Sequence, residues 1–295
     1  MVSDLVEVWD EEWVEVEDGS KMEKIAITGG KGGVGKSTFA ILLAFKLSRQ
    51  GKKVVLCDCD VECPNDYLLL NQKLENPKPI YQEYPELDEQ KCQKCGLCSK
   101  TCKEHAIFWV KDKYPIFIYD LCSGCGACWI VCPNKAIKTK KKVVGESFVN
   151  KVNERFWLVT GRSKPGVSST GPIVRQVKDR AIKFAHDNNA DYLLIDTSPG
   201  AHCNVIQALL NCDKVYAVTE PTPLGAHDLN IILELTQKLK IPSEIVLNRA
   251  DVGSRREIEK IAEKFKNKIS IEIPYSEELV RAYCDKQLER VVNLI

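Results

Sequence analysis

Short apolar runs and helically spaced apolar residues alternate along the chain from about residue 24. Residues 25–27 form an apolar run that leads into a glycine-rich loop, and residues 36–49 carry apolar side chains at helical spacings. Gly51 ends that segment, and residues 54–56 form a second apolar run. The pattern predicts a strand, a helix and a second strand, in that order.

Strand-like runs resume in the second half of the chain. They are residues 156–159, 192–195, 215–218, 245–247 and 269–273. Helical stretches separate most of them, and strands that alternate with helices are typical of a mostly parallel sheet covered on both faces. The expected fold class is therefore α/β, with a doubly wound sheet.

The middle of the chain interrupts this pattern. Residues 71–90 are polar and contain three prolines, which is typical of a linker, and a cysteine-rich block follows. The part before the linker has only two strands and cannot close a core alone, so the middle is expected to be a small α+β domain inserted into one sheet. The predicted parts are an acidic extension (1–21), the sheet domain (22–80 and 146–295) and the insert (81–145).

Composition and charge narrow the class of protein. The 295 residues are 44% hydrophobic and 28% charged, and the formal net charge of +1 gives no overall field that would attract nucleic acid. No run approaches 18 apolar residues and the N-terminus is acidic, so we expect no membrane span, no signal peptide and a cytoplasmic location. The apolar face of residues 276–295 is expected to pack against the sheet, because its opposite face mixes acids and bases, unlike a basic membrane-binding tail.

Charge is unevenly distributed along the chain. Residues 1–20 contain eight acidic residues and no basic one, whereas residues 91–142 contain eleven lysines against three acids, a balance of +8. The basic stretch could attract an acidic electron-transfer partner, or it could be an ordinary solvated lysine-rich face. Nucleic-acid binding is not expected, because the run is short and no aromatic residues interleave it.

The glycine-rich loop has the spacing G-x-x-x-x-G-K-[ST], after a predicted strand and before a predicted helix. Backbone N–H groups of such a loop cradle phosphates, and the helix N-terminus adds its dipole. Lys36 is expected to reach the β- and γ-phosphates, and the Ser37 hydroxyl is expected to bind Mg²⁺. The predicted nucleotide-binding set is Gly30, Lys31, Gly32, Gly33, Val34, Gly35, Lys36, Ser37 and Thr38.

Carboxylates follow two of the predicted strands. Asp196 ends the run 192–195 and is expected to act on Mg²⁺ from the second coordination shell, although an aspartate that caps a helix would look similar. Asp58 and Asp60 close the second strand, where alternation places them on one face and Cys57 and Cys59 on the other. Asp60 is the candidate that orients the attacking water.

Eight cysteines repeat with a period of 30 residues, and each half reads C-x₂-C-x₂-C-x₃-C. This spacing resembles that of a bacterial ferredoxin with two clusters, in which the fourth cysteine of each half serves the other cluster. The predicted [4Fe–4S] ligands are Cys92, Cys95, Cys98 and Cys132 for one cluster, and Cys122, Cys125, Cys128 and Cys102 for the other. Zinc ribbons prefer two C-x₂-C pairs with a wider separation. The two halves differ after their last cysteine: Pro133 follows Cys132, whereas Lys103 follows Cys102.

The sequence KGGVGKST, with Lys31 ahead of the glycines, resembles the deviant Walker A motif of the MinD/ParA/Mrp class, which includes the nitrogenase iron protein. The resemblance covers about residues 22–290 apart from the insert. It implies an ATP- and Mg²⁺-dependent ATPase that forms a dimer with itself or with a related ATPase. In such a dimer Lys31 reaches the nucleotide of the partner.

The same resemblance assigns further roles. It implies that Asp60 is the hydrolytic aspartate and that residues 196–200 form the switch II segment. It also implies that Asn248 hydrogen-bonds adenine and that Pro274 flanks the base. Together with Lys31, Lys36 and Asp196, Asp60 completes the predicted catalytic set.

Cys203 lies seven residues after Asp196, an offset at which the nitrogenase iron protein has a cysteine that holds a bridging cluster. The second bridging cysteine of that protein has no counterpart here. Cys203, with Cys63 nearby, could bind an extra metal at a dimer axis, or both could be ordinary thiols. The remaining four, Cys57, Cys59, Cys212 and Cys284, are expected to be core residues.

The expected function combines the two sites. An ATP-dependent dimer would gate low-potential electron transfer, or assembly of a metallocluster on a client protein, through two [4Fe–4S] clusters. A positioning or scaffold ATPase whose clusters sense redox state is the alternative, and purely structural clusters are the third hypothesis. The expected partners are a second copy of the chain or a related ATPase, and a redox or metallocluster client protein that could be acidic, with neither nucleic acid nor membrane.

Overall fold

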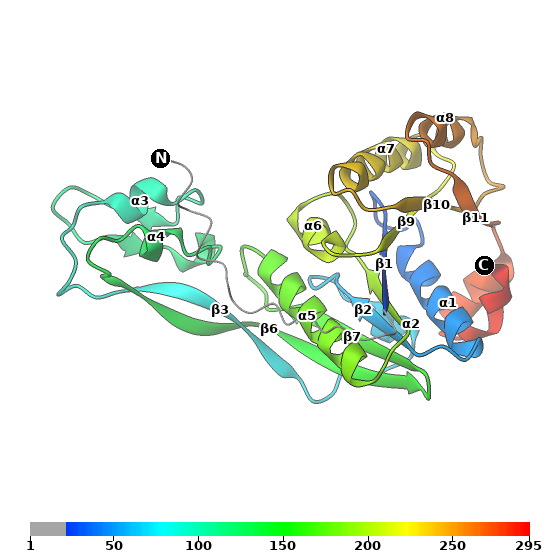
Figure 1. Cartoon of the computed structure of the whole chain (residues 1–295), viewed down its shortest axis with the longest axis horizontal. Helices are drawn as coiled ribbons and strands as arrows, with labels where there is room; N and C mark the ends of the chain where they lie inside the picture. The colour runs from blue at the N-terminus through cyan, green and yellow to red at the C-terminus, as the bar shows by residue number, and fades with distance from the viewer. Residues whose placement is uncertain (1–21) are drawn as a thin grey trace.

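The structure is a computed structural model, and it describes residues 22–295. The predicted acidic extension, residues 1–21, lies outside the described residues. A nine-stranded sheet forms the centre of the described part, in the order β11-β10-β9-β1-β8-β2-β7-β6-β3 (Figure 1). Its strands are β1 Glu23–Thr28, β2 Val54–Asp58, β3 Lys78–Leu87, β6 Ile137–Asn153, β7 Phe156–Ser163, β8 Tyr192–Asp196, β9 Lys214–Thr219, β10 Ser243–Asn248 and β11 Ile269–Ile273.

The strands from β11 to β7 are parallel, which confirms the predicted α/β class with a mostly parallel sheet. All strands that the apolar runs predicted are present. The run in β2 is buried at every position, because helices cover both of its faces. Sequence pattern and packing therefore agree in the centre of the sheet.

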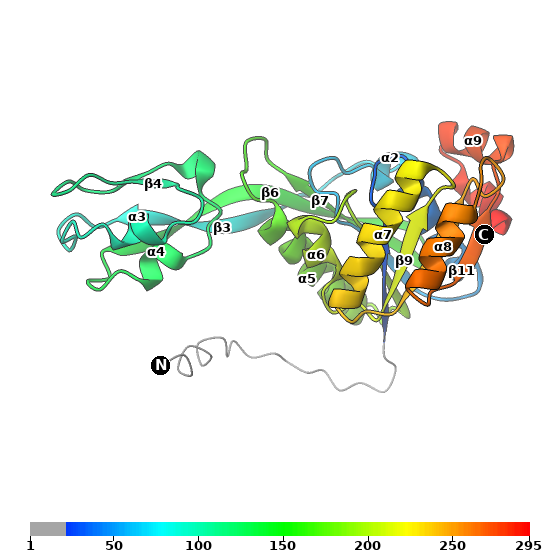
Figure 2. The same cartoon turned by 90° about the horizontal axis from the view of Figure 1, so that it is seen from above.

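Two layers of helices cover the sheet (Figure 2). The first layer is α1 Lys36–Arg49, α9 Glu277–Cys284 and η2 Leu288–Leu294, whose buried side chains share one core with the sheet. The second layer is α5 Gly171–Asp187, α6 Cys203–Leu209, α7 Pro223–Lys238 and α8 Arg256–Lys264. A short helix, α2 Asp66–Leu69, follows β2.

The C-terminal segment packs as its apolar face predicts. Leu288, Val291 and Val292 are buried in the core that contains α1. Among residues 22–295, no helix combines the length and the apolar character needed to cross a bilayer.

Two antiparallel strands at one edge, β3 and β6, extend beyond the sheet as an arm, with Leu87 opposite Ile137 at the far end (Figures 1 and 2). The prediction of a linker over residues 71–90 is wrong for residues 78–87, which form β3. Pro79 and Pro85 are compatible with a strand because β3 is the outermost strand and pairs on one side only. The predicted domain borders at 80/81 and 145/146 fall inside these strands.

Three lysines of β6 contact side chains near them in space. Lys138 Nζ lies 3.0 Å from Asp88 Oδ2, and Lys140 Nζ lies 3.7 Å from Glu86 Oε1. The ammonium of Lys142 stands over the ring of Tyr119, 3.7 Å from its centroid. These contacts give a local structural role to three of the eleven lysines in residues 91–142.

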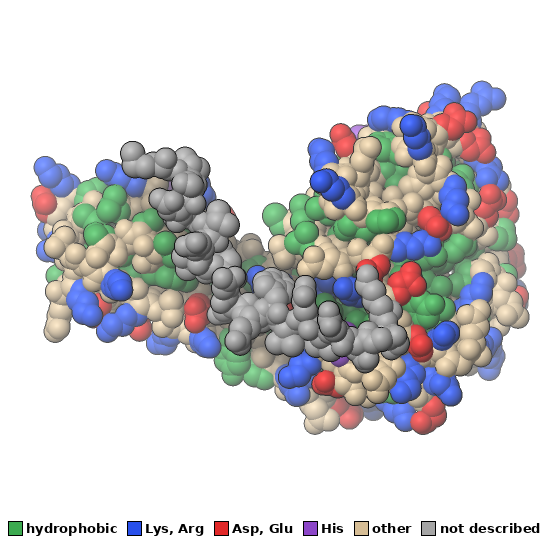
Figure 3. All heavy atoms as spheres, in the orientation of Figure 1, with side chains coloured by type: hydrophobic (Ala, Val, Ile, Leu, Met, Phe, Trp, Pro, Cys, Tyr) green, Lys and Arg blue, Asp and Glu red, His purple; other side chains and the backbone are tan. Residues whose placement is uncertain are grey.

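The arm carries a compact cysteine-rich unit, residues 88–136, which stands apart from the helices of the sheet domain across an open notch (Figure 3). Its elements are α3 Leu97–Thr101, β4 Ile107–Phe108, β5 Ile116–Phe117, η1 Tyr119–Leu121 and α4 Ala127–Ile130. The 30-residue repeat is visible in the backbone, because the same repeat positions have positive φ: 94 and 124, 96 and 126, and 105 and 135. The unit is therefore two copies of one motif.

Candidate functional site

The glycine-rich loop connects β1 to α1 at the carboxyl edge of the sheet. Gly35 has a φ of 97°, and a Cβ atom there would lie 2.5 Å from Asn248 Nδ2. A Cβ atom on Gly30 would lie 2.2 Å from the Cβ of Asp228. Both positions require glycine, one for its backbone conformation and both for space.

The loop opens into a cleft of about 580 Å³. Most residues of the predicted nucleotide site line it, namely Gly32, Gly33, Gly35, Lys36, Ser37, Thr38, Asp60, Asn248 and Pro274. Val34, which belongs to the loop, is instead buried in the core that contains α1. Sequence reasoning missed Tyr275, Leu279 and Tyr283, which form the far wall of the cleft. The apolar helical face of residues 276–295 is a sequence signal for Leu279 and Tyr283, but it predicts packing and not a cleft wall, and it does not include Tyr275.

Lys36 and Ser37 meet the carboxylates at the ends of the neighbouring strands. Ser37 Oγ donates a hydrogen bond to Asp196 Oδ2 at 2.6 Å, and Lys36 Nζ donates one to the carbonyl oxygen of Lys31 at 3.0 Å. Burial lowers the pKa of Lys36, and the carboxylates of Asp196 and Asp60 oppose this effect. The lysine is thus aimed at the loop where phosphates would lie.

Asp196 is almost completely buried, and its Oδ1 has no hydrogen-bond partner among the described residues. Burial raises its pKa to about 7, although the Ser37 hydroxyl and the Lys36 ammonium act in the opposite direction. A buried carboxylate oxygen without a partner beside a serine hydroxyl is a suitable set of oxygens for Mg²⁺. The residues present therefore fit the ion that the sequence predicts.

The alternation predicted for β2 is present. Cys57 and Cys59 are buried with their sulfur atoms 3.5 Å apart, whereas Asp60 lines the cleft. Asp58 is buried and accepts hydrogen bonds from the backbone N–H groups of three residues: Asp60, Asn65 and Asp66. Asp58 fixes the shape of the loop after β2, and Asp60 is left to face the cleft. Burial raises the pKa of Asp60, while a backbone hydrogen bond and the Lys36 cation lower it.

Lys31 forms an ion pair within its own chain that the sequence did not suggest. Its Nζ lies 2.6 Å from Glu220 Oε1, and Arg249 Nη1 lies 2.7 Å from the other oxygen of the same carboxylate. Burial would raise the pKa of Glu220, but the two cations outweigh it and hold that pKa below its usual value. Asn248 Nδ2 likewise donates to the carbonyl oxygen of Val34 at 2.9 Å. In this state both predicted ligand-contacting side chains are held within the chain.

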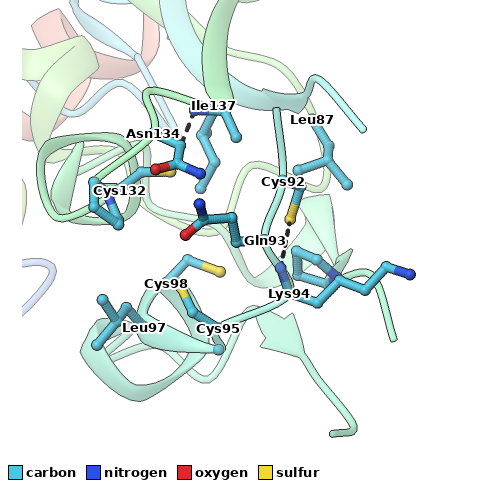
Figure 4. Close-up of a pocket in the computed structure, with 14 residues that line it drawn as sticks. Leu87, Cys92, Gln93, Lys94, Cys95, Leu97, Cys98, Cys132, Asn134 and Ile137 are labelled. Atoms are coloured by element: carbon cyan, nitrogen blue, oxygen red, sulfur yellow. Dashed lines mark hydrogen bonds between the residues drawn. The ribbon is translucent and has the colours of Figure 1, made fainter. Parts of the chain in front are cut away.

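The eight repeat cysteines gather in two groups of four. Cys92, Cys95, Cys98 and Cys132 line one pocket, where Figure 4 shows them approaching from different sides. Cys102, Cys122, Cys125 and Cys128 line a second pocket. We call these groups the first and the second tetrad. Each tetrad combines three cysteines of one repeat half with the last cysteine of the other half, which is the crossed grouping that the spacing predicts.

Matching backbone hydrogen bonds support the last cysteine of each half. The N–H of Ala106 donates to Cys102 Sγ, and the N–H of Ala136 donates to Cys132 Sγ, both at 3.3 Å. Within residues 22–295, no group of three Cys, His, Asp or Glu side chains is arranged to hold a single metal ion. Cys203 and Cys63 are both exposed, and an extra metal bound by them at a dimer axis stays a prediction. Of the four cysteines expected in the core, Cys57, Cys59 and Cys212 are buried, but Cys284 is exposed because α9 turns it towards the cleft.

The chain is similar in sequence to a known family and to several known proteins. The family described as the CobQ/CobB/MinD/ParA nucleotide binding domain matches residues 25–289. Protein MJ0579 of Methanocaldococcus jannaschii is 41% identical over 266 residues, which cover 90% of each chain. An iron-sulfur cluster carrier protein of Methanococcus maripaludis is 26% identical over 245 residues, which cover 81% of this chain and 65% of that protein.

Two further similarities differ in how much of the chain they cover. The ketoisovalerate oxidoreductase subunit VorD of Pyrococcus furiosus is 39% identical over 98 residues, which cover 33% of this chain and 92% of that subunit. Among solved structures, the septum site-determining protein MinD of Pyrococcus horikoshii in complex with Mg-ADP has a TM-score of 0.55 at 18% identity. The match covers 93% of this chain and 94% of that one, and it shows a shared fold.

Proposed function

The chain belongs to the CobQ/CobB/MinD/ParA nucleotide-binding family, and from this premise we propose that it is an ATP-hydrolysing iron–sulfur protein. In the proposed cycle an ATP-dependent dimer gates the use of two [4Fe–4S] clusters. The clusters serve electron transfer to a client protein or assembly of a metallocluster on it.

The observation that carries the proposal is the grouping of the eight cysteines. Two tetrads lie on an arm that is continuous with the sheet whose carboxyl edge forms the nucleotide cleft. Since β6 pairs with β7, and β7 with β2, the arm and the cleft share one hydrogen-bonded framework. A nucleotide-dependent movement of that framework would reach the cysteine-rich unit.

The tetrads suit a multi-iron cluster better than a single zinc ion. A zinc ion needs its four ligands within one small tetrahedron, and the described residues contain no such arrangement. A cubane takes one thiolate at each of four separated corners, and when bound it carries single electrons. The N–H groups of Ala106 and Ala136 would hold the thiolates of Cys102 and Cys132 in place and stabilise their negative charge.

The cleft supplies the nucleotide chemistry. Lys36 would hold the β- and γ-phosphates, and Ser37 would bind Mg²⁺ with Asp196 orienting it through their hydrogen bond. Asp60 faces the cleft and would orient the attacking water. Asn248 and Pro274 would contact the base, with Tyr275 and Tyr283 beside them.

Dimer formation would redirect Lys31. Its ammonium would leave Glu220 of its own chain and bind the phosphates of the nucleotide held by the partner. This change in the contacts of Lys31 therefore requires both ATP and the second subunit. We also propose that the protein is cytoplasmic and that it acts on a client. The name of one relative, an iron-sulfur cluster carrier protein, supports the action on a client. Phe108 and Ile116 on the β4–β5 hairpin are 57% and 61% exposed, which gives a client an apolar surface close to the tetrads.

The proposal is tested by light scattering on anaerobically reconstituted protein. The hydrolysis-blocked variant Asp60→Ala should bind about eight iron atoms per chain and should double its mass with ATP but not with ADP. Adding Lys31→Ala should abolish the doubling, whereas adding Lys260→Ala, which removes an exposed ion pair with Glu257, should not. The proposal would be contradicted if the protein stayed free of iron, or if ATP did not change the mass of the Asp60→Ala variant.

A further inference from the structure

The loop between β7 and α5, residues 164–170, contacts both the cysteine-rich unit and the sheet domain. At one end it reaches the cysteine-rich unit, and at the other it meets the loops that follow β2 and β8 at the edge of the nucleotide cleft. Backbone bonds fix its start, because Ser163 N–H donates to the carbonyl oxygen of Val61 at 2.7 Å and Lys164 N–H donates to that of Val144 at 2.8 Å. The loop is thus tied both to the segment after β2 and to β6.

On the nucleotide side the contacts form a small polar network. Glu62 follows Asp60 by two residues, and its Oε1 accepts hydrogen bonds from Thr170 Oγ1 at 2.6 Å and from Asn204 Nδ2 at 3.3 Å. Asn204 Nδ2 also donates to Thr170 Oγ1 at 2.6 Å. Asn204 belongs to α6, which follows residues 196–200, so the network joins the loops after β2 and β7 to the start of α6. Thr170 and Asn204 are both buried, which strengthens such bonds.

On the cysteine side the loop reaches the second tetrad. Ser168 Oγ donates a hydrogen bond to the carbonyl oxygen of Cys122 at 3.1 Å, and Val167 and Cys122 pack against the same core. The next residue, Ser123, accepts a bond from Gln82 Nε2 of the arm at 2.6 Å. Residues 164–170 line neither tetrad's pocket. Their link to the second tetrad is the bond from Ser168 to the backbone of Cys122.

We propose that Thr170 and Ser168 are positioning residues that couple the nucleotide cleft to the second tetrad through Glu62 and Asn204. The inference rests on the proposed function and deepens it by naming the route and the tetrad that responds. When the loop after Asp60 rearranges around bound nucleotide, Glu62 moves with it. Its bond to Thr170 shifts the start of α5, and Ser168 passes the shift to the backbone of Cys122. Coupling of this kind is worth a factor of about five to 150 in an equilibrium constant.

Hydrogen–deuterium exchange on the full chain, with iron loaded and with the non-hydrolysable analogue AMPPNP and Mg²⁺, tests the route. In the wild type, AMPPNP should change exchange at residues 121–126 by about fivefold or more, with a smaller change at residues 92–98. Thr170→Val removes the bonds of the Thr170 hydroxyl to Glu62 and Asn204 and keeps the size of the side chain. The hydroxyl of Thr170 does not cap α5, so the helix should remain intact. In this variant and in Ser168→Ala, the nucleotide-dependent difference at residues 121–126 should fall below about twofold.

The matched control is Thr236→Val, which removes another buried threonine hydroxyl at a distant place in α7. This control should keep the full nucleotide-dependent difference. If Thr170→Val and Ser168→Ala also keep it, the route is wrong although the gating stands. If the wild type shows no difference at either tetrad while AMPPNP binds, the gating in the proposed function fails as well. The variants could also exchange faster than the wild type by the same factor with and without AMPPNP, so that the nucleotide-dependent difference is retained. That result would give Thr170 a purely structural role and would also overturn the route.

Discussion

Individual residues at the nucleotide cleft are fixed more by backbone shape and crowding than by their own chemistry. Gly35 needs a left-handed backbone and open space beside Asn248. The motif spacing predicted this loop because only glycine satisfies both demands. The partner of Lys31 could not be predicted in the same way, since Glu220 lies 189 residues further along the chain and reaches the lysine only through the fold.

Replacement of Gly35 by alanine should weaken nucleotide binding by about tenfold or more, because a strained backbone and a displaced Asn248 together cost about 1–3 kcal/mol. Titration with a fluorescent ATP analogue measures the effect. Gly51→Ala is the matched control, because Gly51 also has a positive φ but a Cβ atom there would meet nothing within 4 Å. Gly51→Ala should lower stability and leave affinity unchanged; equal affinity losses in both variants would show that the clash with Asn248 is unimportant.

At the scale of elements, the apolar runs predicted the buried strands because those strands are covered on both faces. The arm escaped prediction for a physical reason. Strand β3 contains Pro79 and Pro85, which resemble linker residues in sequence but are harmless at an outer edge, and β6 has lysines in place of an apolar alternation where it leaves the sheet. The tetrads could be predicted because cysteine spacing alone determines which thiols a repeated motif brings together.

Removing one cysteine from each tetrad should separate the two predicted clusters. Cys95→Ser and Cys125→Ser should each reduce bound iron from about eight to about four atoms per chain, and the double variant should bind almost none. Iron and acid-labile sulfide assays after anaerobic reconstitution measure this. Cys284→Ser, outside both tetrads, should retain all the iron. A full iron content in Cys95→Ser and Cys125→Ser would contradict the assignment of the tetrads.

The segment after α9 should matter for stability rather than for the membrane. Leu288 is 1% exposed and packs in the core shared with α1. Leu288→Ala should therefore lower the free energy of unfolding by about 2–5 kcal/mol, which a urea titration of the anaerobic protein measures. Val280→Ala, at a position that is 45% exposed, should change it by less than about 1 kcal/mol. If Leu288→Ala and Val280→Ala lowered the free energy of unfolding equally, Leu288 would not be part of the stabilising core.

At the scale of the whole molecule, one sheet connects a nucleotide cleft to a distant cysteine-rich unit. The nine strands run without interruption from β11 to the arm, so the unit is attached through paired strands and not through a flexible linker. This architecture suits a machine in which occupancy of the cleft changes the position or surroundings of the tetrads. It also explains why the sequence predicted both sites but not the route between them, because the route consists of contacts between residues far apart in the chain.

The central claim is that nucleotide in the cleft alters the clusters. Anaerobic redox titration followed by electron paramagnetic resonance, on protein with AMPPNP and Mg²⁺, with ADP and without nucleotide, tests it most directly. A tenfold coupling corresponds to a shift of about 59 mV in the midpoint potential of a one-electron centre, and we expect AMPPNP to shift at least one cluster by about that amount. Identical potentials and identical spectra in all three states would contradict the account.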